Sequence, residues 1–229
     1  MELLKYRHKV ETIDLLSKTS VTKCGGTNRL SVICAFAFGI VSLFGFAPLS
    51  VHAQSPQSVV LKNEKGGVVY RLESGSNGGR LLDGADKEVA QFNRKDESKR
   101  RVLVIKKGNA PLGFIASKHS GKWEIYDQNN TMQFVFKQEE AGYKLKSSDE
   151  QSLFRIKPRP YGMEVETSDD KSQYKTRVDT TGIRFENNQG KLVYSAPARQ
   201  GALMISCFGL DKLSIEQKAA LSCAVDTMR

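Results

Sequence analysis

Few side chains between residues 54 and 229 have the types and spacing that catalysis requires. His119 is the one histidine in that stretch, and no serine there lies in a nucleophile motif. Two acidic pairs, Asp149-Glu150 and Asp169-Asp170, recur twenty residues apart. Both fall at expected hairpin turns, where Asp is a common turn residue, so turn chemistry explains them. The sequence therefore predicts a protein that is not an enzyme. A hydrolase of unrecognised type is the least favoured alternative.

Metal and thiol chemistry also has little support in this stretch. A Cys/His metal site needs more ligands than one histidine and two distant cysteines supply. We therefore expect no metal and no cofactor. Cys207 and Cys223 leave two alternatives open: a disulfide between them, which an oxidising compartment would permit, or two small buried side chains.

Basic side chains give the most suggestive pattern for binding. Residues 54–229 hold 29 Lys or Arg against 22 Asp or Glu, a formal charge of +7, which favours anionic partners. Seven cations fall on the outward row of the expected strands and would form one stripe: Lys144, Lys146, Arg155, Lys157, Lys175, Arg177 and Arg184. Acidic residues share this row, so the alternative is ion pairing across strands. These acidic residues are Glu124, Glu164, Glu166 and Glu186.

The elements that position these charges are β-hairpins, and the clearest one is Gly121–Glu140. Apolar and polar side chains alternate in its two halves, which is the period of a strand with one buried face. Asn129-Asn130 lies between the halves and tolerates the backbone of a tight turn. With this loop, Trp123 faces Phe136 and Ile125 faces Phe134.

The same unit returns every twenty residues, and the pattern indicates seven hairpins in all. The repeat predicts an inward aromatic column: Phe114, Phe134, Phe154, Tyr174 and Tyr194. Because the aromatic side chains face inward, they form no platform for stacking bases, and we expect no nucleic-acid partner. So many hairpins with one apolar face must close into a barrel or fold into two layers.

The C-terminal region changes character after Pro197. Residues 202–208 are almost continuously apolar, which predicts a strand covered on both faces. Ser214 and Gln217 have the spacing of a capping box, and the residues that follow are apolar nearly all round. We expect a buried helix over about 214–227.

The N-terminus has the pattern of an export signal. Residues 1–53 contain a mildly basic start, an apolar segment over 30–47, and small residues before an expected cleavage site after Ala53. Residues 54–58 would be a linker and 59–229 one domain. The alternative is an uncleaved anchor. The domain would be periplasmic or secreted in the first case, and held at the inner membrane by residues 30–47 in the second.

The strand-pair repeat, seen in 122–137 and 143–157, and the C-terminal segment 202–226 resemble the tubby-like barrel superfamily, which includes the LURP-one-related and scramblase families. Similar exported bacterial proteins have no assigned activity. The resemblance implies a roughly twelve-stranded barrel around a central C-terminal helix. It also implies a role at membranes, because family members bind membrane phosphoinositides or sit at membranes. No family site motif is matched residue by residue.

Two functional hypotheses follow, and they belong to different classes. The first is an exported, non-enzymatic β-barrel that binds at the cell envelope and contacts anionic membrane lipid. The second is an interaction scaffold whose barrel binds another envelope protein and has no role with lipid. Salt-sensitive binding to anionic vesicles would separate them, because exposed charges are screened by salt.

Overall fold

The structure is a computed structural model, and it describes residues 57–97, 100–119, 121–198 and 201–228. The expected signal or anchor over 1–53 and its cleavage site lie outside the described residues. The chain divides into two units, Met1–Ser50 and Val51–Arg229, and every described residue belongs to the second. The first strand begins at Gln57, so the last two residues of the expected linker 54–58 belong to a strand.

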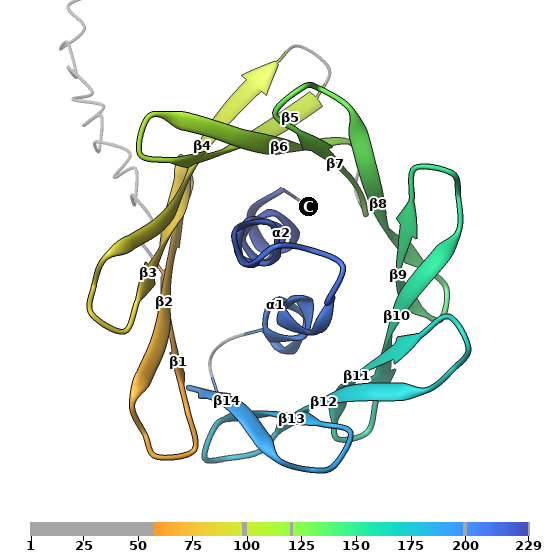
Figure 1. Ribbon diagram of the computed structural model, residues 1–229. Helices are drawn as coiled ribbons and strands as arrows, with labels where there is room; N and C mark the ends of the chain where they lie inside the picture. Colours follow the sequence, from red (N-terminus) through yellow and green to blue (C-terminus); the bar gives the residue numbers. More distant parts are fainter. Residues whose placement is uncertain (1–56, 98–99, 120, 199–200, 229) are drawn as a thin grey trace, which may run out of the picture. The chain divides into compact units, whose positions relative to one another are not determined.

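The described residues contain fourteen strands, which form a closed antiparallel barrel (Figure 1). The strands are β1 (Gln57–Lys62), β2 (Val68–Gly75), β3 (Gly78–Asp83), β4 (Glu88–Glu97), β5 (Arg100–Lys107), β6 (Ala110–His119), β7 (Lys122–Asp127), β8 (Met132–Glu139), β9 (Gly142–Ser147), β10 (Ser152–Arg159), β11 (Gly162–Thr167), β12 (Ser172–Val178), β13 (Ile183–Asn187) and β14 (Leu192–Ala196). Each strand pairs with its neighbours in the sequence, and β1 closes on β14 where Lys62 lies opposite Ser195.

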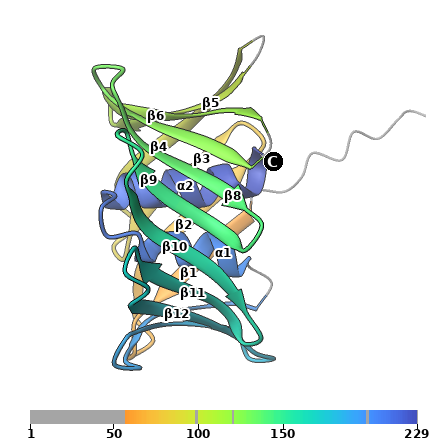
Figure 2. The same ribbon diagram turned by 90° about the vertical axis from the view of Figure 1, so that its right-hand side faces the viewer.

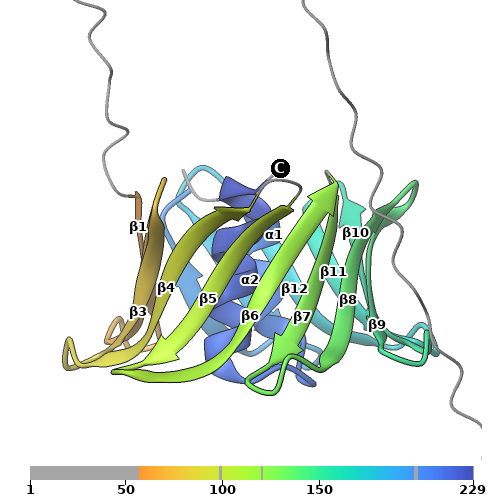
Figure 3. The same ribbon diagram turned by 90° about the horizontal axis from the view of Figure 1, so that it is seen from above.

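The barrel confirms the prediction of an up-and-down sheet with a C-terminal helix, and it corrects the strand number. Seven hairpins give fourteen strands, whereas the resemblance implied about twelve. Barrel diameter grows with strand number, and about eight strands already enclose a space that side chains fill. A fourteen-stranded barrel is wider, and helices occupy its interior (Figures 1 and 3).

The hairpin of β7 and β8 has the predicted register. Trp123 lies opposite Phe136, and Ile125 lies opposite Phe134. The Trp123 side chain is 1 % exposed and packs against Phe136 with ring centroids 5.8 Å apart. Inward side chains of this kind from all around the barrel form one continuous hydrophobic core.

Seven turns lie at one rim of the barrel, which we call the long-turn rim. In several of these turns the side chain of the residue that opens the turn accepts two backbone N–H groups. The Asp127 carboxylate, for example, accepts from Asn129 and Thr131, each at 2.9 Å. The residue three positions after the opening one takes a left-handed conformation, as at Asn130 with φ of 61° and Glu150 with φ of 66°. These side chains stabilise the turns, as expected for short polar residues.

Four members of the predicted aromatic column point inward, and Phe114 does not. Phe134, Phe154, Tyr174 and Tyr194 belong to the core or pack against it. In β6 the inward residue is Ile115, which lies opposite Leu103 and Ile125. Pairing shifts at irregularities within β6, and a shift of one residue reverses which side chains face inward. The prediction of an inward Phe114 was therefore wrong.

The interior is filled by two helices, α1 (Ala202–Ser206), followed by a 3-10 turn at Cys207–Gly209, and α2 (Ile215–Thr227). The strand predicted over 202–208 was therefore wrong. A short apolar run does not distinguish a buried strand from a buried helix. Inside a closed barrel a helix satisfies its own backbone groups, whereas a lone strand would not. The capping box of Ser214 and Gln217 is confirmed.

The helices pass along the interior, with α2 against β2–β6 and α1 against β11–β13 (Figure 2). Buried hydroxyl groups hold them in place: Ser222 donates to the Met204 carbonyl at 2.7 Å, and Thr176 and Ser206 share a hydrogen bond of 2.7 Å. Neither helix combines the length and the apolar character that spanning a bilayer requires among the described residues.

Candidate functional site

The seven predicted cations all lie on the outer wall of the barrel, between β9 and β13. The structure divides them into two groups with different surroundings. One group is interleaved with carboxylates, and it consists of Lys157 on β10, Lys175 and Arg177 on β12, and Arg184 on β13. The other group contains Lys144 on β9 and Arg155 on β10, which continue into further cations on β7 and β8, with Lys146 beside them.

The first group forms a balanced ion-pair network. One row across the strands alternates in sign, because Lys157 lies opposite Glu164, which lies opposite Lys175, and Lys175 lies opposite Glu186. Salt bridges link these strands further: Lys157 to Glu166 at 2.6 Å, and Arg177 and Arg184 to Glu186 at 3.0 and 3.1 Å. Every cation of this network pairs with a carboxylate or lies opposite one, so the alternative of cross-strand pairing describes this part of the wall.

Arg159, which was not among the seven, is the centre of this network. Its guanidinium donates to Glu164 and to Glu166, each at 2.7 Å. Burial raises the pKa of Glu164, but the hydrogen bond and the positive charge of Arg159 oppose this effect, and the net pKa lies below its usual value. Both carboxylates are almost fully buried although they lie on the outer wall.

The second group forms a row of like charges, which we call the basic row. Lys122 lies opposite Lys137, Lys137 opposite Lys144, and Lys144 opposite Arg155. Like charges directly opposite each other destabilise a sheet. Partial compensation comes from Glu124 for Lys122 and from other acids for Lys144 and Arg155; those acids are Glu139 at 2.7 Å and Asp170 at 2.7 Å.

A small surface cavity of about 310 Å³ lies at the end of the basic row. Three of the predicted cations line it: Lys144, Arg155 and Lys157. A hydrogen bond from Lys144, with the nearby charges of Lys137 and Lys146, holds the pKa of Glu139 at its edge below the usual value. Three cations and one carboxylate line the cavity, a composition that favours an anionic group such as a phosphate. Lys146 lies beside the row and pairs with Glu150 at 3.0 Å.

An outer apolar patch lies next to the basic row, and sequence reasoning missed it. It consists of outward side chains on β5–β8: Val104, Leu112, Phe114, Tyr126 and Met132. Leu112 is 36 % exposed, and the rings of Phe114 and Tyr126 are half-buried. Apolar residues occur in both alternating sets of positions along β6. The alternation of apolar and polar residues alone therefore did not show which set faces outward.

Hydrogen bonds connect the outer apolar patch to the basic row. On β7 the Glu124 carboxylate accepts from Lys122 at 2.9 Å and from the Tyr126 hydroxyl at 2.9 Å. The Arg100 guanidinium lies over the Phe114 ring, 5.9 Å from its centroid. Aromatic rings and cations therefore form one continuous face over β5–β10.

The other residues considered for chemistry are separate from this face. Cys207 and Cys223 are free and buried, so the disulfide alternative is not what the structure contains. Burial raises the pKa of the Cys207 thiol to about 12. His119 is exposed at the end of β6. No group of three or more potential metal ligands occurs among the described residues.

Comparisons with protein-family models and with curated proteins gave no match to this chain. Membership of the tubby-like barrel superfamily therefore stays a prediction from the sequence.

Proposed function

We propose that this chain is an exported, non-enzymatic β-barrel module that associates with anionic membrane surfaces. The observation that carries the proposal is the outer apolar patch beside the basic row. Apolar side chains enter the boundary between headgroups and acyl chains, and neighbouring cations attract anionic headgroups.

The basic row and the outer apolar patch are separated along the direction of the strands. Lys122 and Tyr126 are four residues apart on β7, which is about 13 Å along an extended strand. The cations can therefore contact headgroups while the patch reaches the interface. Each cation near an anionic surface contributes about 1 kcal/mol, reduced here by the paired carboxylates.

Co-sedimentation of residues 51–229 with neutral and anionic liposomes tests the proposal. This segment contains all of the described strands and helices, which form the closed barrel and its core. Binding should be confined to anionic vesicles and should weaken as salt is raised. No binding at low salt would overturn the proposal and leave the interaction scaffold as the alternative.

A matched pair of variants separates the basic row from net charge. Lys137→Gln with Lys144→Gln removes two cations from the row, and Lys175→Gln with Arg184→Gln removes two from the balanced network. The first variant should lose binding several-fold, whereas the second should bind nearly as the parent does. Equal losses would show that only net charge matters and would contradict the proposed face.

A further inference from the structure

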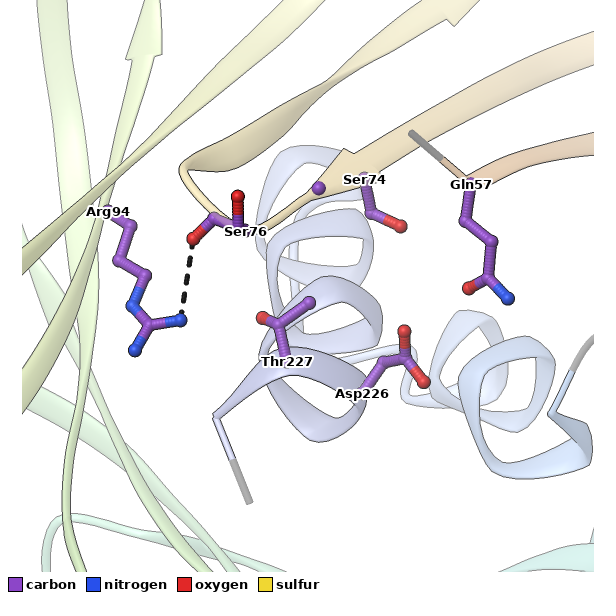
Figure 4. A pocket seen from close by; sticks show the side chains of 7 residues that line it. Gln57, Ser74, Ser76, Arg94, Asp226 and Thr227 are labelled. Carbon is purple, nitrogen blue, oxygen red and sulfur yellow. Dashed lines mark hydrogen bonds between the residues drawn. The ribbon is translucent and has the colours of Figure 1, made fainter. Parts of the chain in front are cut away.

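A second cavity, of about 550 Å³, lies at the other rim of the barrel, where β1 begins and α2 ends (Figure 4). Its polar side chains come from distant parts of the sequence: Gln57, Ser74, Ser76, Arg94, Asp226 and Thr227. The volume is in the range of sites for small molecules. The cavity shares no lining residue with the basic row or the outer apolar patch.

Asp226 gives this cavity its charge. It lies in the last turn of α2, which has no basic side chain among its described residues. The C-terminal end of a helix carries a partial negative charge, so an acid there is electrostatically unfavourable. Asp226 has no salt-bridge partner among the described residues. A cation in the cavity would compensate both the carboxylate and the helix end.

Arg94, the cation in the lining, already has other partners. Arg94 pairs with the Asp96 carboxylate at 2.9 Å and donates to the Ser76 carbonyl at 3.4 Å. Figure 4 shows Arg94 on one side of Thr227 and Asp226 on the other. Because Asp96 offsets the charge of Arg94, Asp226 is the charged group of the lining that has no salt-bridge partner among the described residues.

The remaining polar groups can all accept hydrogen bonds. Ser74 is 3 % exposed and takes the inward position that Leu72 takes two residues earlier on β2, so a hydroxyl replaces an apolar side chain there. Thr227 donates to the Cys223 carbonyl at 2.9 Å, which leaves its oxygen lone pairs for an incoming donor. The Gln57 amide oxygen is a further acceptor.

We propose that this cavity binds the ammonium group of a small organic amine. An ammonium group has three donors, no acceptor and a positive charge, which matches a lining of acceptors around one carboxylate. Asp226 supplies the counter-charge, and the hydroxyl groups of Ser74 and Thr227 accept the other N–H groups. The proposal is independent of membrane association, because its residues lie outside the face described above.

Titration of ¹⁵N-labelled residues 51–229 with ethanolamine, followed by amide chemical shifts, tests the site. The amides of Ser74, Ser76 and Thr227 should shift saturably. Asp226→Asn should weaken binding about tenfold or more, because a charged hydrogen-bond partner is lost. Glu64→Gln, an equal change of charge at an exposed residue of the long-turn rim, should leave binding unchanged.

Three results would overturn the proposal. Absence of saturable shifts at these amides would show that the cavity does not take an amine. An unchanged response of Asp226→Asn would place the amine elsewhere. Equal shifts with sodium chloride, at matched concentration, would mean that the site takes inorganic cations rather than an ammonium group. The amide spectrum of each variant reports whether the barrel is still folded.

Discussion

The Phe114 ring stacks on the Tyr126 ring, with centroids 4.5 Å apart and planes 10° from parallel, on the outside of the barrel. Such a pair contributes about 0.5–1.5 kcal/mol beyond the area it buries. Its outward position means that it covers little of the core. We therefore relate the pair to what the outer wall contacts rather than to the stability of the barrel.

Replacing Phe114 with Ser should reduce binding to anionic vesicles while the barrel stays folded. The change removes the aromatic centre of the outer apolar patch and leaves the basic row intact. Vesicle co-sedimentation measures the loss, and the intrinsic fluorescence of the single tryptophan reports folding. Val178→Ser is the matched control, because Val178 is 41 % exposed on β12. If both variants lose binding equally, the patch has no special role.

Much of the barrel could be predicted because its hairpins repeat. Trp123 and Phe136 alternate with polar residues, so their pairing followed from the period of a strand. The capping box at Ser214 was predictable because it depends on two nearby side chains. Local patterns of this kind need no knowledge of distant contacts.

Other features depend on contacts that a linear pattern does not contain. Ile115 and Phe114 are both apolar, and irregular pairing within β6 decides which of them faces inward. Residues 202–208 are helical because they lie inside a closed barrel, where a lone strand would leave backbone groups unpaired. The split between the basic row and the balanced network depends on which strands are neighbours. Lys137 meets Lys144, whereas Lys157 meets Glu164.

Arg159→Gln should destabilise the barrel by roughly 1–3 kcal/mol at neutral pH, because two nearly buried carboxylates lose their shared partner. The pKa of Glu164 lies below its ordinary value of 4.5. The stability that Glu164 contributes is therefore present above about pH 4.5 and is lost as the pH falls through its lowered pKa. Urea unfolding at several pH values should show the difference from the parent shrinking in acid.

The control for this prediction is Arg80→Gln. Arg80 pairs with Glu73 at 2.6 Å, but its side chain is 51 % exposed, so the pair is largely solvated and the effect should be small. A difference between parent and Arg159→Gln that stays constant down to low pH would mean that Arg159 acts through packing rather than through its carboxylates.

Both cysteines of residues 51–229 should resist alkylation in the folded barrel and react in denaturant without a reductant. Cys207 and Cys223 are free and buried, and burial raises both pKa values, so neither reactive thiolate nor access is available. Mass spectrometry after iodoacetamide treatment counts the modified thiols. If neither thiol reacted in denaturant until a reductant was added, the two residues would be joined by a disulfide.

Asp226→Asn should stabilise the barrel by about 0.3–1 kcal/mol, because it removes a negative charge from the negative end of α2. Urea unfolding followed by Trp123 fluorescence measures the change, since this side chain is buried in the core. Glu64→Gln should have no comparable effect, because Glu64 lies in an exposed turn between β1 and β2. A loss of stability in Asp226→Asn would show that the carboxylate has a structural partner. A gain in stability would mean that the Asp226 carboxylate destabilises the barrel, as expected of a group that binds a ligand.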